Sequence, residues 1–367
     1  MKMVSLIAAM CLAVAVPPVA AQTSRRLVII DNDFGVPTSA IQAIPLISSD
    51  QVKVLGLTAV IGDSAVPDDV MHTLRFLEII GRGDIPVHAG ANTPLVRTKE
   101  ELDGWSRLYG SFPWKGAWND PAPGQAALGP DDVGPMQAGP TTLKAAPGHA
   151  VTFLIDQVRA HPGEISIEAA GPLTNLALAV RLDPGFAAHV KELVIMGGLV
   201  DANLKQVTDD ANFNNDFNFK FDPEAADIVL TAPFPRIRIV SGVANKVRLT
   251  PDLLARVMTV KTPLTTYYER FALKGLPLWD ELTAAVLLDP SLVTKSTKAY
   301  MRVDLDHGMN YGSAHVWPEE MRPHLGERQV EIVEDIDADR FRDLIVASLQ
   351  TRAPGATSSD GRHQRSK

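Results

Sequence analysis

Short apolar runs alternate along this chain with stretches that are apolar on one helical face, and this alternation limits the folds open to it. The runs at 27–30 and 52–61 are almost continuously hydrophobic and rich in Val, Ile and Leu. Such runs are typical of parallel strands buried on both faces. The stretch 70–80 places Leu74 and Leu77 at helical spacing. The alternation predicts an α/β fold with a Rossmann-like, mostly parallel sheet flanked by helices.

The same reading continues to the end of the chain. We expect strands at 27–30, 52–61, 85–87, 165–169, 193–196, 238–241, 300–305 and 329–333. We expect helices at 39–47, 70–80, 151–160, 172–180, 223 onward, 251–258, 263–273, 281–288 and 338–349. Asp222-Pro223 predicts a capped helix start, because Asp favours the N-cap and Pro the first turn.

The N-terminal residues 1–21 are typical of a secretory signal peptide. Lys2 provides a positive start, 4–16 is almost wholly apolar, and 19–21 supplies small residues for cleavage before Gln22. The apolar run is too short to span a membrane. We therefore expect a secreted or periplasmic protein, with no membrane span in the mature chain.

The remaining bulk properties exclude several kinds of chemistry. The only cysteine, Cys11, lies within the signal peptide, so the mature chain has no disulfide, catalytic thiol or zinc–thiolate site. A formal net charge of −8 provides no basic surface for nucleic acid, so we expect no nucleic-acid partner. One domain over 22–353 and a disordered, polar tail over 354–367 complete the expected organisation.

The segment 92–147 interrupts the alternation. It is rich in Gly and Pro and carries Trp105, Trp114 and Trp118. Loops of this length inside a compact domain are often functional, so we interpret the segment as a lid-like insertion that covers a ligand. A poorly ordered linker is the alternative.

Polar residues gather where the expected strands end. In open α/β sheets, ligands bind beyond the carboxyl ends of the strands. Residues at those ends are Asp31 and Asp33, Gly62-Asp63, 171–175, 196–198 and an Asn-rich loop at 201–221. Carboxylates suit a hard cation or a general base, and Asn and Asp side chains suit several hydroxyl groups. These ends predict a polar binding site.

Taken together, these segments resemble the nucleoside N-ribohydrolases, the inosine–uridine preferring nucleoside hydrolase family. The opening Leu27–Ala40 (LVIIDNDFGVPTSA) is similar to the family signature D-x-D-x-G-x-D-D after the first strand. The likeness continues through Gly62-Asp63, 79–94 (IIGRGDIPVHAGANTP), 171–183 (GPLTNLALAVRLD), 194–198, 216–226 (DFNFKFDPEAA) and 278–290 (LWDELTAAVLLDP). It spans roughly 27–293.

The resemblance implies an enzyme that hydrolyses the N-glycosidic bond of ribonucleosides to free base and ribose. Family members bind one Ca²⁺ ion, which holds the ribose 2′- and 3′-hydroxyls and the attacking water. Asp33 matches the metal-ligating general base, and Asp31 is its metal-side partner. Thr174 matches a threonine whose main-chain carbonyl binds the metal, and Asp280 matches a late aspartate ligand. The resemblance also implies a small nucleoside substrate and a homodimer or homotetramer.

The substrate-binding residues follow from the same comparison. Asp63 matches a ribose-binding position, Asp216 and Asn218 match residues that bind ribose hydroxyls, and Met196 lies beneath the sugar. For the 5′-hydroxyl the matching residue is Asn212 or Asn214, because an insertion there leaves both alignments open.

The chain departs from the family pattern at two places. Pro37-Thr38 stand where the signature has its final two aspartates, the second of which binds Ca²⁺. Trp279 stands where some members have a histidine that protonates the leaving base. Tryptophan cannot deliver that proton but can stack on a base, and Trp114 or Trp118 would provide the second stacking face. This arrangement resembles purine-preferring members.

Other interpretations stay open at this point. A haloacid dehalogenase-type phosphatase also places D-x-D after its first strand but needs a lysine at a later strand end, and we find none there. A non-catalytic ribonucleoside-binding protein would explain the altered metal motif. Individually, the Asp31/Asp33 pair fits a solvated turn, Asp280 a helix N-cap, and Trp279 an ordinary core residue.

Overall fold

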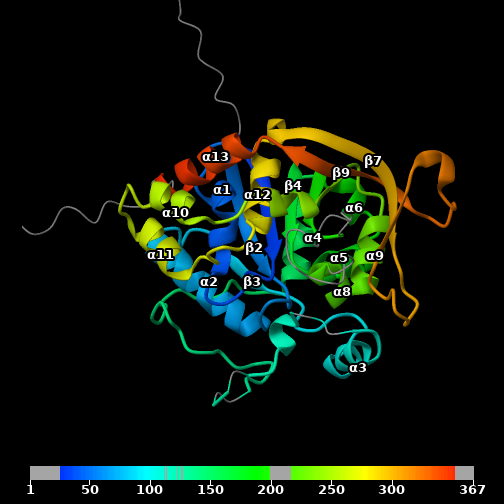
Figure 1. Ribbon diagram of the computed structural model, residues 1–367, viewed down its shortest axis with the longest axis horizontal. Coiled ribbons are helices and arrows are strands. Elements are labelled where there is room, and N and C mark those ends of the chain that lie inside the picture. Colours follow the sequence, from blue (N-terminus) through cyan, green and yellow to red (C-terminus); the bar gives the residue numbers. More distant parts are fainter. Residues whose placement is uncertain are drawn as a thin grey trace, which may run out of the picture.

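The computed structural model describes residues 25–351 except 111, 113, 122, 125–126 and 199–215. A nine-stranded sheet runs through the molecule in the order β3-β2-β1-β4-β5-β6-β9-β7-β8 (Figure 1). Its parallel strands are β1 (Arg26–Asn32), β2 (Val52–Ala59), β3 (Val87–Ala89), β4 (Ile165–Ala170), β5 (Glu192–Met196), β6 (Ile237–Val240) and β9 (Arg328–Ile336). Antiparallel β7 (Val293–Val303) and β8 (Ala314–Trp317) complete one edge.

Helices cover both faces of the sheet, because its strands are apolar on both sides. In β1, Val28 and Ile30 belong to one core cluster and Ile29 to the other. The first face carries α1 (Ile44–Ile47), α2 (Val66–Ile80), α10 (Pro251–Val257), α11 (Pro263–Phe271), α12 (Trp279–Leu288) and α13 (Ala338–Gln350). The second carries α4 (Ala150–Ala160), α5 (Thr174–Leu182), α6 (Phe186–His189) and α9 (Pro223–Thr231). The predicted α/β class with a mostly parallel sheet is confirmed.

Most predicted elements are present, with differences at the edges. The structure adds β8, starts β7 at Val293 rather than 300, and starts α12 at Trp279 rather than 281. The early start of β7 was missed because residues 294–298 are exposed and polar, so they lack the apolar alternation that predicts a strand. The predicted cap is confirmed: Asp222 accepts the N–H of Ala225 at the start of α9.

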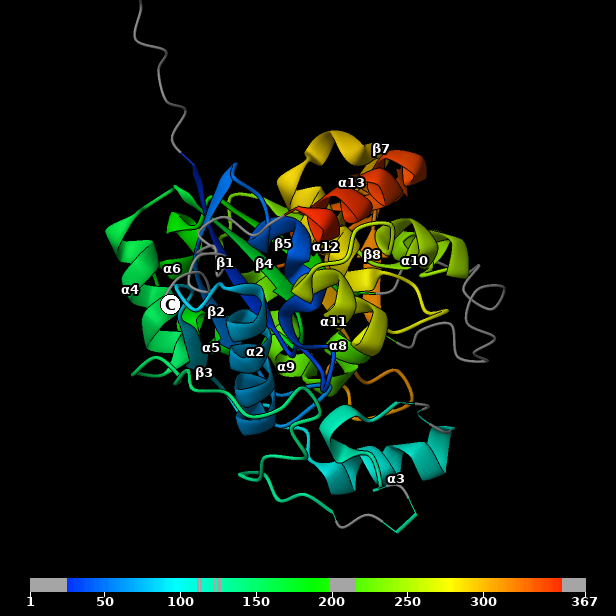
Figure 2. The same cartoon turned by 90° about the vertical axis from the view of Figure 1, so that its left-hand side faces the viewer.

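The insertion 92–147 is partly structured. It contains α3 (Lys99–Tyr109), which the sequence analysis did not predict, and whose N-cap Thr98 accepts the N–H of Glu101. Trp105 in α3 is buried, and its Nε1 donates to the carbonyl of Gly308 over 2.9 Å. In both views the insertion gathers at one end of the molecule (Figures 1 and 2). The poorly ordered linker is therefore the wrong alternative for α3.

The predicted signal peptide, 1–21, and the tail, 354–367, lie outside the described residues. Within the described part of the chain, no helix combines the length and apolar character needed to cross a bilayer.

Candidate active site

Asp31 is a buried anchor at the end of β1. Its Oδ1 accepts hydrogen bonds from Thr58 Oγ1 at 2.5 Å and Asn175 Nδ2 at 2.8 Å, which tie β1 to β2 and α5. Burial raises the pKa of Asp31 to about 6, although both hydrogen bonds act against this rise. Asp31 is not among the described residues that line the adjacent cavity. The sequence analysis predicted Asp31 as a metal ligand. In the structure its carboxylate lies beneath the residues that line the cavity.

Asp33 faces the cavity directly beyond the strand. Its side chain is buried, and its Oδ2 accepts the main-chain N–H of Asp63 at 2.9 Å. A Cβ at Gly62 would lie 2.0 Å from that Oδ2, so only glycine leaves room for the carboxylate there. Burial raises the pKa of Asp33 well above its usual value, and the neighbouring carboxylates of Asp63 and Asp280 raise it further. Asp33 thus has the position and the raised pKa that suit a general base near neutral pH.

Asp63 connects the strand ends to the insertion. Its Oδ1 accepts the indole N–H of Trp114 at 2.6 Å, while the carbonyl of Gly62 accepts the N–H of Ala117 at 2.8 Å. A Cβ at Gly116, where φ is +53°, would lie 2.0 Å from the Gly62 oxygen. Glycine is thus required for this close approach. The insertion is consequently fixed against the Gly62-Asp63 turn, with Trp114 at the cavity wall.

Asp280 and Trp279 approach from the first turn of α12. Asp280 Oδ2 accepts from Asn32 Nδ2 at 3.2 Å, and burial raises its pKa to about 7. The N-cap position belongs to Leu278, so Asp280 is not the helix cap. Trp279 Nε1 donates to Asn245 Oδ1 at 3.0 Å, which fixes the ring against the cavity. Both residues line the cavity.

A second group of side chains, from Met196, Asp216 and Asn218, lines the same cavity. Asn218 Nδ2 donates to the carbonyl of Met196 at 3.0 Å, which leaves its Oδ1 available to a ligand. Asp216 Oδ2 accepts the N–H groups of Gly198 at 2.7 Å and Phe219 at 3.0 Å, and caps the short helix α8 (Phe217–Phe221). Burial raises the pKa of Asp216 to about 6.

The roles of the Thr174 main-chain carbonyl and of the Asn212 and Asn214 side chains stay predictions. Thr174 Oγ1 donates to Asp222 Oδ2 at 2.6 Å, within the start of α5 and α9, and Thr174 is not among the described lining residues. The last residue of β4, Ala170, lines the cavity instead. Asn212 and Asn214 lie outside the described residues.

The cavity between these groups has a volume of about 520 Å³, within the range of small-molecule sites. Its lining combines acids and amides with aromatic rings. The described residues around it are Asp33, Gly35, Val36, Thr38, Gln42, Asp63, Phe112, Trp114, Ala170, Met196, Asp216, Phe217, Asn218, Ser241, Gly242, Asn245, Leu273, Leu276, Trp279 and Asp280.

Sequence reasoning missed several members of this lining. Ser241 ends a predicted strand, so its place at the sheet edge was a usable signal. Phe112, Phe217 and Asn245 gave none, because loops and tertiary packing bring them there.

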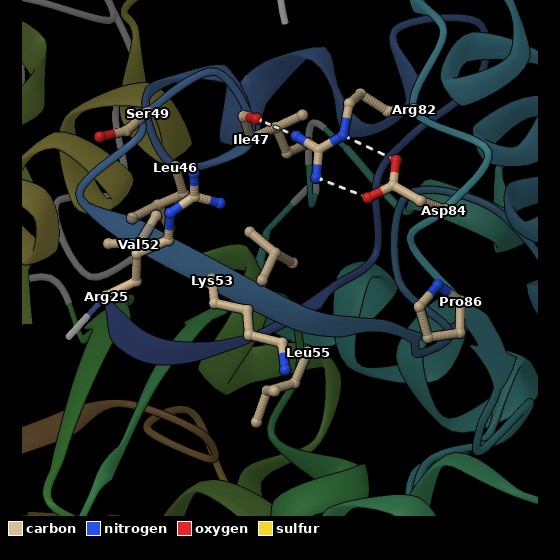
Figure 3. Close-up of a pocket in the computed structure, with 11 residues that line it drawn as sticks. Arg25, Leu46, Ile47, Ser49, Val52, Lys53, Leu55, Arg82, Asp84 and Pro86 are labelled. Atoms are coloured by element: carbon tan, nitrogen blue, oxygen red, sulfur yellow. Dashed lines mark hydrogen bonds and ion pairs between the residues drawn. The ribbon is translucent and has the colours of Figure 1, made fainter. Parts of the chain in front are cut away.

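A second cavity, of about 550 Å³, lies beside the amino-terminal half of β2 (Figure 3). Arg82 forms a paired ion contact there with Asp84, at 2.8 and 3.0 Å, and also donates to the carbonyl of Ile47. The Asp84 carboxylate is therefore already paired with a cation. This second cavity also lies away from the carboxyl ends of the strands. The cavity at Asp33 is the better candidate.

The donor set at Asp33 suits a hard cation in its chemistry. The described lining residues include four aspartates and no Lys, Arg or His. Behind them, Asp69 Oδ1 and Oδ2 and Asp31 Oδ2 are buried without a hydrogen-bond partner. Uncompensated buried carboxylates are expensive unless they are protonated or bind a cation. However, within the described residues no three acidic or imidazole side chains already converge on one point.

The parallel sheet, the carboxylates at its strand ends and the polar cavity define an α/β protein with a binding site for a small polar ligand. Comparison with known proteins specifies the family. Residues 28–343 match the model of the inosine-uridine preferring nucleoside hydrolases, so the chain belongs to that family. It is an enzyme of the nucleoside hydrolase class, which acts on the N-glycosidic bond of ribonucleosides.

Individual relatives agree with this assignment. The chain is 29% identical to the pyrimidine-specific ribonucleoside hydrolase RihB of Escherichia coli, over 78% of this chain and 86% of that protein. It is 32% identical to a probable uridine nucleosidase of Arabidopsis thaliana, over 74% of this chain and 80% of that protein. The solved plant nucleoside hydrolase PpNRh1 superposes with a TM-score of 0.69 at 27% identity, covering 89% of this chain and 99% of that one.

Proposed function

We propose that this enzyme hydrolyses ribonucleosides with a water molecule that Asp33 deprotonates, in a site that binds Ca²⁺. The observation that carries the proposal is that Asp33, Asp63, Asp280, Asp216 and Asn218 line one cavity, and that the first three lie close enough for their charges to interact. The acids suit a cation and a base, and Asp216 and Asn218 suit sugar hydroxyls.

Each of these residues has its own role in the reaction. Asp216 and Asn218 bind ribose hydroxyls through the oxygens that their structural hydrogen bonds leave free. Asp33 accepts the proton of the water that attacks the anomeric carbon. The C–N bond breaks with its electrons passing to the base, which takes a proton from solvent, and Asp33 returns its own proton to solvent. The transition state is oxocarbenium-like, so the surrounding anionic and neutral groups stabilise its positive charge. When bound, Ca²⁺ supplies Lewis acidity that lowers the pKa of a coordinated water.

Aromatic residues form the part of the cavity that suits the leaving base. Trp279 and Trp114 both line it, whereas Trp118 packs on Phe221 with ring centroids 4.4 Å apart. Trp114 is therefore the candidate for the second stacking face. Two aromatic faces favour purines, the larger bases. Comparing turnover of inosine, guanosine and uridine tests this preference, and an enzyme that hydrolyses uridine alone would contradict it.

The activity itself is tested with p-nitrophenyl riboside, with and without Ca²⁺. Calcium-dependent release of p-nitrophenol supports the proposal, and binding of nucleoside without turnover would contradict it. We also propose that residues 1–21 direct export. Amino-terminal sequencing of the protein recovered from the periplasm or medium should then begin at Gln22.

A further inference from the structure

The carboxylate of Asp63 lies over the turn that lacks the family's acidic residue. An ideal Cβ placed on Gly35 would lie 3.2 Å from Asp63 Oδ2 and 3.2 Å from Thr38 Oγ1. These two side chains therefore border the same small space. The carboxylate that is absent at position 38 is thus present beside it, supplied by the end of β2 rather than by the turn after β1.

An unpartnered acid lies directly behind this pair. Asp69, in the first turns of α2, is fully buried, and neither of its carboxylate oxygens has a hydrogen-bond partner of normal geometry. Burial raises its pKa well above the usual value, the charges of Asp33 and Asp63 raise it further, and the Ser64 hydroxyl offsets a part of this. A buried carboxylate with free oxygens beside two others points to a positively charged ligand, because the described lining of the cavity provides no cationic side chain.

We propose that Asp63 replaces the missing acid at position 38, so that the cation is held between Asp33, Asp63 and Asp280, with Asp69 adding negative charge from behind. This inference rests on the proposed function for the presence of a cation. All three carboxylates line the same cavity. Carboxylate oxygens are the ligands that Ca²⁺ takes.

The test measures Ca²⁺ binding by isothermal titration calorimetry on metal-free protein, separately from turnover. Asp63→Asn should weaken Ca²⁺ affinity at least about tenfold, and Asp69→Asn by a smaller factor. Asp120→Asn removes an acid of the insertion 92–147 whose side chain is 87% exposed, and should leave Ca²⁺ affinity unchanged. Thermal unfolding of each variant shows that the fold is retained.

Two further variants distinguish a ligand from a structural role. Thr38→Asp combined with Asp63→Asn restores the family's acid in the same space and should recover most of the lost affinity. Trp114→Phe removes the indole donor to Asp63 but keeps the carboxylate, so Ca²⁺ affinity should stay close to that of the unaltered enzyme.

Several results would overturn the inference. Among them are unchanged Ca²⁺ affinity in Asp63→Asn, absence of Ca²⁺ binding to the unaltered protein, and a loss in Trp114→Phe as large as that in Asp63→Asn. The proposed function is judged separately: Asp63-dependent Ca²⁺ binding without nucleoside hydrolysis would contradict the function and leave the inference standing.

Discussion

The main-chain N–H of Asp63 donates a 2.9 Å hydrogen bond to Asp33 Oδ2, which joins the end of β2 to the residue best placed to act as the base. Because the side chain of the same Asp63 holds Trp114 at 2.6 Å, the insertion, β2 and β1 meet at one point. The carboxylate at the end of β1 is therefore positioned by residues far from it in sequence.

Asp33→Asn should abolish most turnover and keep the fold. The amide cannot accept the proton of the attacking water, and general-base catalysis contributes about 10²–10⁴-fold in rate. Stability should be unchanged or slightly higher, because a buried carboxylate with a raised pKa is costly to ionise. Steady-state kinetics on p-nitrophenyl riboside and thermal unfolding check both parts. Turnover within about threefold of the unaltered enzyme would contradict the mechanism.

The metal-free protein should become less stable as the pH rises from about 5 to about 8. Burial, and then the charge of Asp280, raise the pKa of Glu281 from 4.5 to about 8. The folded state thus retains a proton that the unfolded state loses in this range, so unfolding becomes more favourable as pH rises. Melting temperatures in EDTA should fall by roughly 5 °C across the range.

Glu281→Gln provides the control for this pH dependence. The amide cannot titrate, so the decline in melting temperature between the same pH values should be smaller than in the unaltered protein. A melting temperature that rises with pH in EDTA would contradict the assignment of Glu281 as a protonated buried acid.

Trp279→Ala should lower kcat/KM because it weakens contact with the base of the nucleoside. Binding of the ribose should be little affected. Loss of one stacking face costs about 1–3 kcal/mol, or roughly 5- to 150-fold in kcat/KM for inosine. Inhibition by free ribose should change little. Trp279→Phe keeps a stacking ring but loses the hydrogen bond to Asn245. Its kcat/KM for inosine should therefore lie between those of the unaltered enzyme and Trp279→Ala. Equal kinetics in all three proteins would place the base elsewhere.

Asn218→Ala should instead weaken binding of the ribose. Its amide is oriented by the Met196 carbonyl at 3.0 Å, and its free oxygen faces the cavity. Removing it should weaken inhibition by ribose by roughly tenfold, the value of one hydrogen bond of about 1.5 kcal/mol. A 2′-deoxyribonucleoside should already be a poor substrate, and equal use of ribo- and deoxyribonucleosides would contradict this assignment.

The sequence by itself determined the sheet and the acids at its edge. Continuous apolar runs at β1 and β2 required burial on both faces, and parallel strands bring their carboxyl ends together. Strand ends predicted the positions of Asp33 and Met196, the family resemblance added Asp216 and Asn218, and all four line the cavity.

Only the tertiary structure decided the details that depend on depth and on distant loops. Asp31 lies within β1, where Thr58 and Asn175 bind it, whereas Asp33 lies beyond the end of the strand. The Thr174 hydroxyl binds Asp222, and Trp114 lines the cavity whereas Trp118 packs on Phe221. These outcomes are set by packing between segments far apart in the chain, which local patterns of residues do not record. Of the two acids at the end of β1, Asp31 is thus a buried anchor and Asp33 faces the cavity.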